Sequence, residues 1–157
     1  VGGIGTTGTL MGVSKRLKEF NPEVKIIGVE PYPNSSIQGL KNLSSQYVPE
    51  IYDPSRLDEK INVKDEDAFE MARVLTIREG IFCGISSGAV MWGTLQKAME
   101  LDDGVVVTLF PDGGEKYVST PLYEPSKCFE CLQKHRIPTC MTAEYITALE
   151  CLVKNGG

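Results

Sequence analysis

The residues best suited to chemistry form a loop near the start of the chain, Gly5-Thr6-Thr7-Gly8-Thr9, and a helical pattern follows it directly. The first N–H groups of a helix have no partner within the helix, and the helix dipole makes that end positive. Glycines let the backbone approach a ligand closely, and threonine hydroxyls add further donors. The loop is therefore typical of a phosphate-binding site.

The same loop also fits a dinucleotide site. Residues 3–8 match the pattern G-x-G-x-x-G, and a predicted strand over residues 24–29 leads to Glu30, about where an acid that binds ribose would lie. A purely structural turn is a third interpretation. The loop alone does not decide between them.

Two further loops follow predicted strands. Ser86 and Ser87 stand at the start of a helical pattern, and residues 112–114 follow the apolar stretch 105–110, which we predict to be a central parallel strand buried on both faces. Binding loops of open α/β sheets lie at this carboxyl edge. A dinucleotide has no evident use for the serine pair. An aromatic cofactor with a phosphate at one end and a ring nitrogen at the other would use both loops.

The elements that position these loops alternate between strands and helices, which predicts a three-layer αβα fold with a mostly parallel sheet. A helix over residues 8–20 should bury Leu10, Val13, Leu17 and Phe20. A short strand at 61–63 should lead into a helix that starts with three acids and ends at Gly80. Residues 37–43 could form a short helix. The composition changes near Tyr123, so we expect a first part over residues 1–123 and a cysteine-rich helical extension over 124–157, with its last helix after Thr142.

Composition excludes several classes of function. The 157 residues carry a net charge of −5 without a basic run, which argues against nucleic acid and anionic membrane surfaces as partners. We find no apolar stretch of spanning length and no signal peptide, so we expect a cytoplasmic protein. The chain begins at Val1, almost inside the loop. We therefore expect it to be part of a longer fold.

Four motifs together resemble a known family. They read G-T-T-G-T-L-M-G, E-P-Y-P-N-S-S-I, R-E-G-I-F-C-G-I-S-S-G-A and G-G-E-K-Y-V-S-T, and they span residues 1 to about 123. They are similar to the cysteine synthases, pyridoxal-phosphate enzymes of the tryptophan-synthase-β fold type. The closest likeness is to the B-type, which has G-T-T-G-T where the A-type has G-T-G-G-T.

The resemblance implies pyridoxal 5'-phosphate as the cofactor. The residues implied to bind its phosphate are Gly5, Thr6, Thr7, Gly8 and Thr9. Ser86 would bind the pyridine nitrogen, with Asp112 and Gly113 near the same ring edge. A neutral serine there makes the ring a milder electron sink, which suits β-elimination and replacement.

The resemblance also implies the reaction. The family makes L-cysteine from an activated serine, O-acetylserine or O-phosphoserine, and sulfide or another sulfur donor, and the complete enzyme would be a homodimer. The family's Schiff-base lysine and its substrate-carboxylate loop lie in an N-terminal half that matches nothing in this chain. We therefore assign no catalytic residue and expect the chain alone to be inactive. An NAD-binding Rossmann module and a non-catalytic scaffold remain alternatives.

Lys41 matches the position of a basic residue that meets the substrate phosphate in some B-type enzymes. Lysine would act there as a point charge. The alternative is a solvated surface lysine, since lysine is mostly exposed.

Four residues near the end of the chain could bind zinc. Cys128, Cys131, His135 and Cys140 are one residue short of a zinc-knuckle spacing. Packed free thiols and a redox pair are the other interpretations, because Cys128 and Cys131 fall on one face of a short helix.

Overall fold

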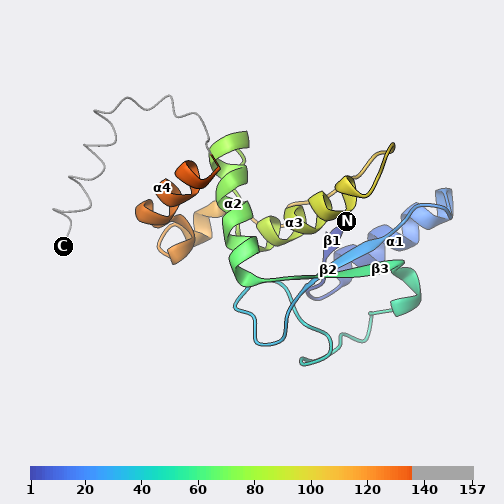
Figure 1. The fold of residues 1–157 in the computed structure, drawn as a ribbon. Coiled ribbons are helices and arrows are strands. Elements are labelled where there is room, and N and C mark those ends of the chain that lie inside the picture. Colours follow the sequence, from blue (N-terminus) through green and yellow to red (C-terminus); the bar gives the residue numbers. More distant parts are fainter. Residues whose placement is uncertain (136–157) are drawn as a thin grey trace.

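A three-stranded parallel sheet of order β1-β2-β3 is the centre of the computed structural model, which describes residues 1–135 (Figure 1). The strands are β1 (Gly2–Gly3), β2 (Ile27–Pro31) and β3 (Glu59–Val63). Gly2 pairs with Gly28, and Val29 pairs with Ile61. The predicted α/β class with a parallel sheet is confirmed.

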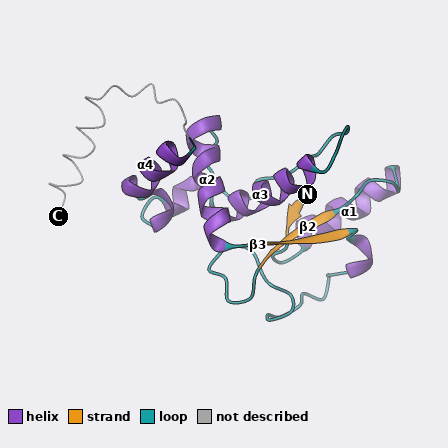
Figure 2. Ribbon diagram, in the orientation of Figure 1, coloured by secondary structure: helices purple, strands orange, loops and turns teal. Residues whose placement is uncertain are grey.

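The helices are α1 (Gly8–Phe20), α2 (Asp65–Glu79), α3 (Ile85–Met99) and α4 (Pro125–Lys134), with 3₁₀ turns η1 (Pro54–Arg56), η2 (Gly114–Tyr117) and η3 (Pro121–Tyr123). Helices α1 and α3 lie beside this sheet, and α4 lies beyond α2, away from the strands (Figure 2). The predicted start and end of α2 are confirmed: acids fill its first turn, and Gly80 follows it with a φ of 69°. α2 packs closely on α3, because a Cβ at Gly88 would lie 2.1 Å from the carbonyl oxygen of Ala68.

Two hydrophobic clusters form the core. Ile4 and Ile26 pack with Leu10 and Met11 of α1 in one cluster. The other joins residues of β2 and β3 to α2 and α3 and includes Val29, Val63, Ala72 and Ala89. Helices therefore cover different sides of the sheet, as an α/β fold requires.

The predicted buried face of α1 is wrong in part. The helix buries Leu10, Met11 and Ser14. In contrast, Val13, Leu17 and Phe20 are exposed by 46%, 42% and 73%. The helix buries a different face from the predicted one, because Leu10 and Met11 are the residues that pack against Ile4.

The predicted central strand at residues 105–110 is also wrong. The segment has no strand structure, and Val105, Val107 and Leu109 are exposed by 90%, 72% and 55%. It runs beside the start of β1, since the amino group of Val1 donates to the carbonyl oxygen of Val107 at 2.8 Å. A strand is buried on both faces only with neighbours, and no described strand within residues 1–135 pairs with this segment.

Three smaller predictions also need correction. Residues 37–43 form a loop rather than a helix, since the Asn42 amide donates to the carbonyl oxygen of Pro31 and its oxygen accepts from the N–H groups of Ser44 and Ser45. The strand predicted at 24–29 begins at Ile27. The strand predicted before Ser86 is reduced to a single antiparallel bridge, between Cys83 and Gly113.

Helix α4 is attached to the rest of the described chain. It packs on α2 and η3, and Lys134 donates to Glu70 at 2.6 Å. Arg73 of α2 donates to the carbonyl oxygen of Leu122 at 2.6 Å. The division at residue 123 remains a prediction, and the helix predicted after Thr142 lies outside the described residues. No helix within residues 1–135 is long and apolar enough to cross a membrane.

Candidate cofactor site

The loop of residues 5–9 connects β1 to α1 and leaves the start of the helix open. Thr7 is the N-cap, and no side chain caps the helix. The first helical hydrogen bond runs from the N–H of Met11 to the carbonyl oxygen of Thr7, at 2.8 Å, so the N–H groups of Gly8 and Thr9 have no helical partner. The first turn contains no acid. This positive end is therefore free to receive an anion.

The Thr7 side chain supports the same interpretation. Thr7 is only 3% exposed, and its hydroxyl oxygen is enclosed by the fold without a hydrogen-bond partner. A buried hydroxyl without a partner costs about 1–3 kcal/mol. Its backbone φ of 66° is also uncommon for a β-branched residue. Such an atom, at the open end of a helix, fits the phosphate of a cofactor.

Gly39 connects the loop to Ser86. A Cβ on Gly5 would lie 2.3 Å from the carbonyl oxygen of Gly39, and a Cβ on Gly39 would lie 3.6 Å from the Ser86 hydroxyl oxygen. Gly39 has a φ of 88°, which favours glycine. The structure therefore brings two predicted binding elements to opposite sides of one residue. The sequence analysis missed Gly39, since a lone glycine in a predicted helix gave no signal of a site.

Ser86 and Ser87 differ in their contacts. Ser86 is 3% exposed, and its hydroxyl makes no hydrogen bond with any residue of the described range 1–135. Ser87 is fully buried, and its N–H donates to Oδ1 of Asp112 at 3.1 Å. The Ser87 hydroxyl bonds to Asp112 as well. Of the two serines, Ser86 is thus the one whose hydroxyl is free for a ligand.

Asp112 is fully engaged by its neighbours. Besides Ser87, its carboxylate accepts from the Tyr117 hydroxyl at 2.9 Å. Burial, together with this hydrogen bond to a negative group, raises the pKa of Tyr117 to about 12. Gly113 pairs with Cys83. Asp112 therefore supports the start of α3, and its predicted place at a ring edge remains a prediction.

Glu30 does not have the role that a dinucleotide site needs. Its side chain is buried, and its two carboxylate oxygens accept from Lys60 Nζ at 2.9 Å and from the N–H of Leu43 at 3.1 Å. The hydrogen bond with Glu30 raises the pKa of Lys60. Both oxygens that would bind ribose hydroxyls are used within the fold.

Lys41 lies next to the phosphate-binding loop. Its N–H donates to the carbonyl oxygen of Ile4 at 2.7 Å. The residue is partly buried, and it forms no ion pair within residues 1–135. The location is compatible with the predicted substrate contact.

The structure does not support the zinc prediction. Nε2 of His135 lies 2.5 Å from Oε1 of Glu70, and burial raises the pKa of both the Cys128 and the Cys131 thiols. No group of three or more possible metal ligands occurs among the described residues. Cys140 lies outside them. Cys128 and Cys131 are free thiols, half-buried and buried respectively.

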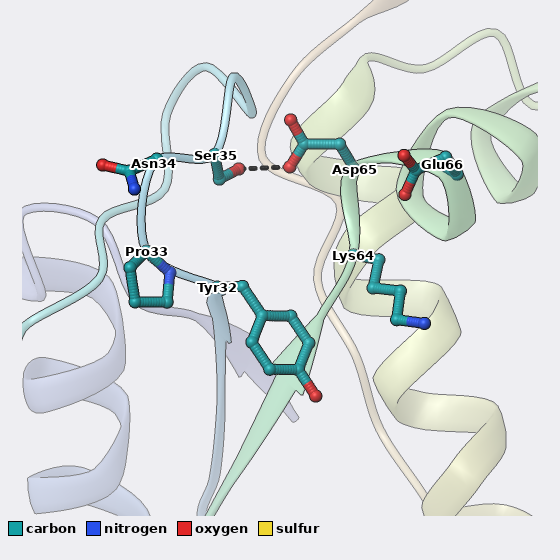
Figure 3. A pocket seen from close by; sticks show the side chains of 7 residues that line it. All are labelled: Tyr32, Pro33, Asn34, Ser35, Lys64, Asp65 and Glu66. Carbon is teal, nitrogen blue, oxygen red and sulfur yellow. Dashed lines mark hydrogen bonds between the residues drawn. The ribbon is translucent and has the colours of Figure 1, made fainter.

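An open pocket of about 280 Å³ lies where β2 and β3 end (Figure 3). Tyr32 and Ser35 line one side, and Lys64 and Asp65 line the other. Ser35 donates to Asp65 at 2.5 Å. None of the predicted site residues lines this pocket, so it is separate from the phosphate-binding loop.

Comparison with known proteins decides the family. Residues 1–112 match the family described as pyridoxal-phosphate dependent enzymes. The chain belongs to this family. The open helix end and the unpartnered Thr7 hydroxyl fit the phosphate group of the cofactor for which this family is described.

The relatives within the family are cysteine synthases. The chain is 50% identical over 128 residues to a cysteine synthase of Aquifex aeolicus. This alignment covers 78% of this chain and 39% of that protein. It is 42% identical over 125 residues to cysteine synthase B of Pseudomonas aeruginosa, covering 80% and 42%. The chain thus spans about two fifths of the length of these relatives.

Solved structures of related enzymes have a similar fold. An O-ureido-L-serine synthase is 36% identical with a TM-score of 0.71, covering 77% of this chain and 41% of that one. O-acetyl serine sulfhydrylase isoform 3 of Entamoeba histolytica is 34% identical with a TM-score of 0.72, covering 85% and 44%. The chain therefore has part of the tryptophan-synthase-β-like fold.

Proposed function

We propose that this chain binds pyridoxal phosphate as part of a cysteine synthase that replaces a group at the β-carbon of an activated serine. The buried Thr7 hydroxyl without a partner, at the open start of α1, carries the proposal. Membership of the family and the names of the relatives support it.

Each residue has a defined task in this proposal. The N–H groups of Gly8 and Thr9 and the hydroxyls of Thr6 and Thr7 donate to the phosphate, while Gly5 keeps the loop close to Gly39. The Ser86 hydroxyl binds the ring nitrogen. When bound, the cofactor supplies the electron sink for loss and replacement of the β-substituent.

The names of the relatives support the proposed substrates. We propose O-acetylserine or O-phosphoserine with sulfide or another sulfur donor as substrates, L-cysteine as the product, and a cytoplasmic homodimer as the complete enzyme. The 157-residue chain on its own should make no cysteine, because no residue in it matches the family's Schiff-base lysine. Measurable cysteine synthesis by this polypeptide would contradict that statement.

Lys41 would distinguish the two activated serines. Its backbone is bonded next to the phosphate-binding loop, and its ammonium would meet the phosphate of O-phosphoserine as a point charge. In the complete enzyme, Lys41→Ala should raise KM for O-phosphoserine far more than KM for O-acetylserine. Equal effects on both substrates would refute this role.

A panel of ligands tests the binding proposal on the chain as it is. The single tryptophan, Trp92, lies on α3, packs against the core and can report binding by fluorescence. Pyridoxal phosphate and inorganic phosphate should bind, and pyridoxal without phosphate should bind much more weakly. NAD should not compete, because Glu30 is paired with Lys60. Tighter binding of NAD than of pyridoxal phosphate would overturn the proposal.

A further inference from the structure

We propose that Asp112 is a positioning residue that caps helix α3 from a distant part of the chain and thereby fixes Ser86 toward the cofactor. This inference rests on the proposed function in one respect, the contact between Ser86 and the ring nitrogen. In this inference Asp112 acts through the helix rather than through a contact of its own with the cofactor.

Helix α3 needs such a cap, because its own sequence does not supply one. The N-cap is Gly84, which has no side chain, and the first turn contains no acid. Side-chain oxygens normally accept from the second or third N–H group of a helix. Here the third residue is Ser87, and its N–H donates to Oδ1 of Asp112 at 3.1 Å. A negative group at this end also complements the helix dipole.

Asp112 is held in place by its own contacts. Its Oδ2 accepts from the Tyr117 hydroxyl at 2.9 Å, and its carbonyl oxygen accepts from the N–H of Gly84 at 3.2 Å. The raised pKa of Tyr117, about 12, keeps that hydroxyl a donor at neutral pH. A Cβ at Gly84 would lie 2.0 Å from Oδ2 of Asp112, so the carboxylate packs directly on the N-cap.

The cap explains the different roles of the serine pair. Because Asp112 takes both the N–H and the hydroxyl of Ser87, the start of α3 is already occupied by a negative group. The Asp112 carboxylate would repel a phosphate at this end. Ser86, one residue earlier, is held between this cap and Gly39 with its hydroxyl unpaired. The α1 end thus suits the cofactor phosphate, and the α3 end suits a neutral ring nitrogen.

Two ligands and a conservative variant test the inference on the full chain. Asp112→Ala should weaken binding of pyridoxal phosphate about three- to ten-fold, the usual effect of one lost hydrogen bond, and leave binding of inorganic phosphate unchanged. Asp112→Asn should restore most of the affinity, because asparagine caps a helix as well as aspartate. Asp53→Ala is the matched control. Asp53 accepts from the N–H and hydroxyl of Ser55 in the same pattern, but in η1.

A double-mutant cycle tests the route through Ser86. Ser86→Ala should remove the ring contact, and Asp112→Ala should then cause no further loss of affinity for pyridoxal phosphate. Additive losses would show that Asp112 acts elsewhere. Equal losses for pyridoxal phosphate and inorganic phosphate would show general damage to the fold. Each of these results overturns the inference.

Amide hydrogen exchange tests the cap without any ligand. Asp112→Ala should speed exchange at Ser87 at least about ten-fold, the factor for roughly 1.4 kcal/mol of local opening, and leave the amides of α2 unchanged. Unchanged exchange at Ser87 would overturn the cap. A wild-type chain that binds no pyridoxal phosphate would instead overturn the proposed function, while the exchange data would still decide the cap.

Discussion

Replacing Thr7 by valine should make the protein more stable and a poorer binder at the same time. Valine keeps the branched shape of threonine but has no hydroxyl. The Thr7 hydroxyl is buried without a hydrogen bond, so the fold loses its bonds to water and gains none in return. Removing the hydroxyl removes this cost and stabilises the folded state. The same hydroxyl is a proposed donor to the cofactor phosphate.

The magnitude follows from that one atom. A buried unpaired hydroxyl costs about 1–3 kcal/mol. The backbone at Thr7, with φ of 66°, is equally strained with either branched side chain, so this strain cancels. We expect the free energy of unfolding to rise by about 1 kcal/mol, which is about 2–4 °C in Tm for a chain of this size. Loss of one charged hydrogen bond should weaken binding of phosphate about ten-fold.

The assay combines urea unfolding with a fluorescence titration of inorganic phosphate, and Thr94→Val is the matched control. Thr94 is also a buried threonine in a helix, but its hydroxyl donates to the carbonyl oxygen of Val90 at 2.8 Å. The same change there should lower the free energy of unfolding by about 1 kcal/mol and leave phosphate binding unchanged. If Thr7→Val lowers stability as Thr94→Val does, or binds phosphate like the wild type, the reasoning is refuted.

Three other predictions concern groups away from the loop. Hydrogen bonds from Lys18 and the N–H of Ile26 hold the pKa of Asp58 below its usual value. Asp58 therefore stabilises the fold above about pH 4, and this contribution is lost as the pH falls. Asp58→Asn should make the loss of stability at acid pH less steep, as measured by urea unfolding across pH. Burial raises the pKa of Cys83 to about 11, so iodoacetamide should leave it unlabelled at pH 8 in the folded chain, as checked by mass spectrometry, and rapid labelling would contradict its burial. Glu30→Gln should destabilise the chain by leaving the Lys60 ammonium without its partner, and a urea midpoint equal to that of the wild type would contradict this.

Local patterns in the sequence predicted the elements that local contacts determine. The start of α2 is set by its run of acids and its end by Gly80, which needs a positive φ. The loop before α1 was also predicted from a local pattern, since its glycines and threonines are neighbours in the sequence. Thr7 then proved to be the N-cap.

Contacts between distant residues account for the errors. The apolar run at 105–110 predicts a buried strand, but burial depends on neighbouring strands that the run itself does not encode. Glu30 looked like a ribose-binding acid because its partner, Lys60, is remote in sequence. The two serines at α3 could not be told apart until Asp112 was seen to bind Ser87.

The most direct test of the central claim is a phosphorus NMR titration of pyridoxal phosphate with the 157-residue chain and its Gly8→Asp variant. A Cβ at Gly8 meets only Ile51, at 3.8 Å, so the variant should fold, and an acid in the first turn even favours the helix. The account predicts that the wild-type chain shifts the phosphate resonance and saturates at one equivalent, and that Gly8→Asp abolishes the shift by repelling the phosphate. An unshifted resonance with the wild type, or an equal shift with the variant, would contradict it.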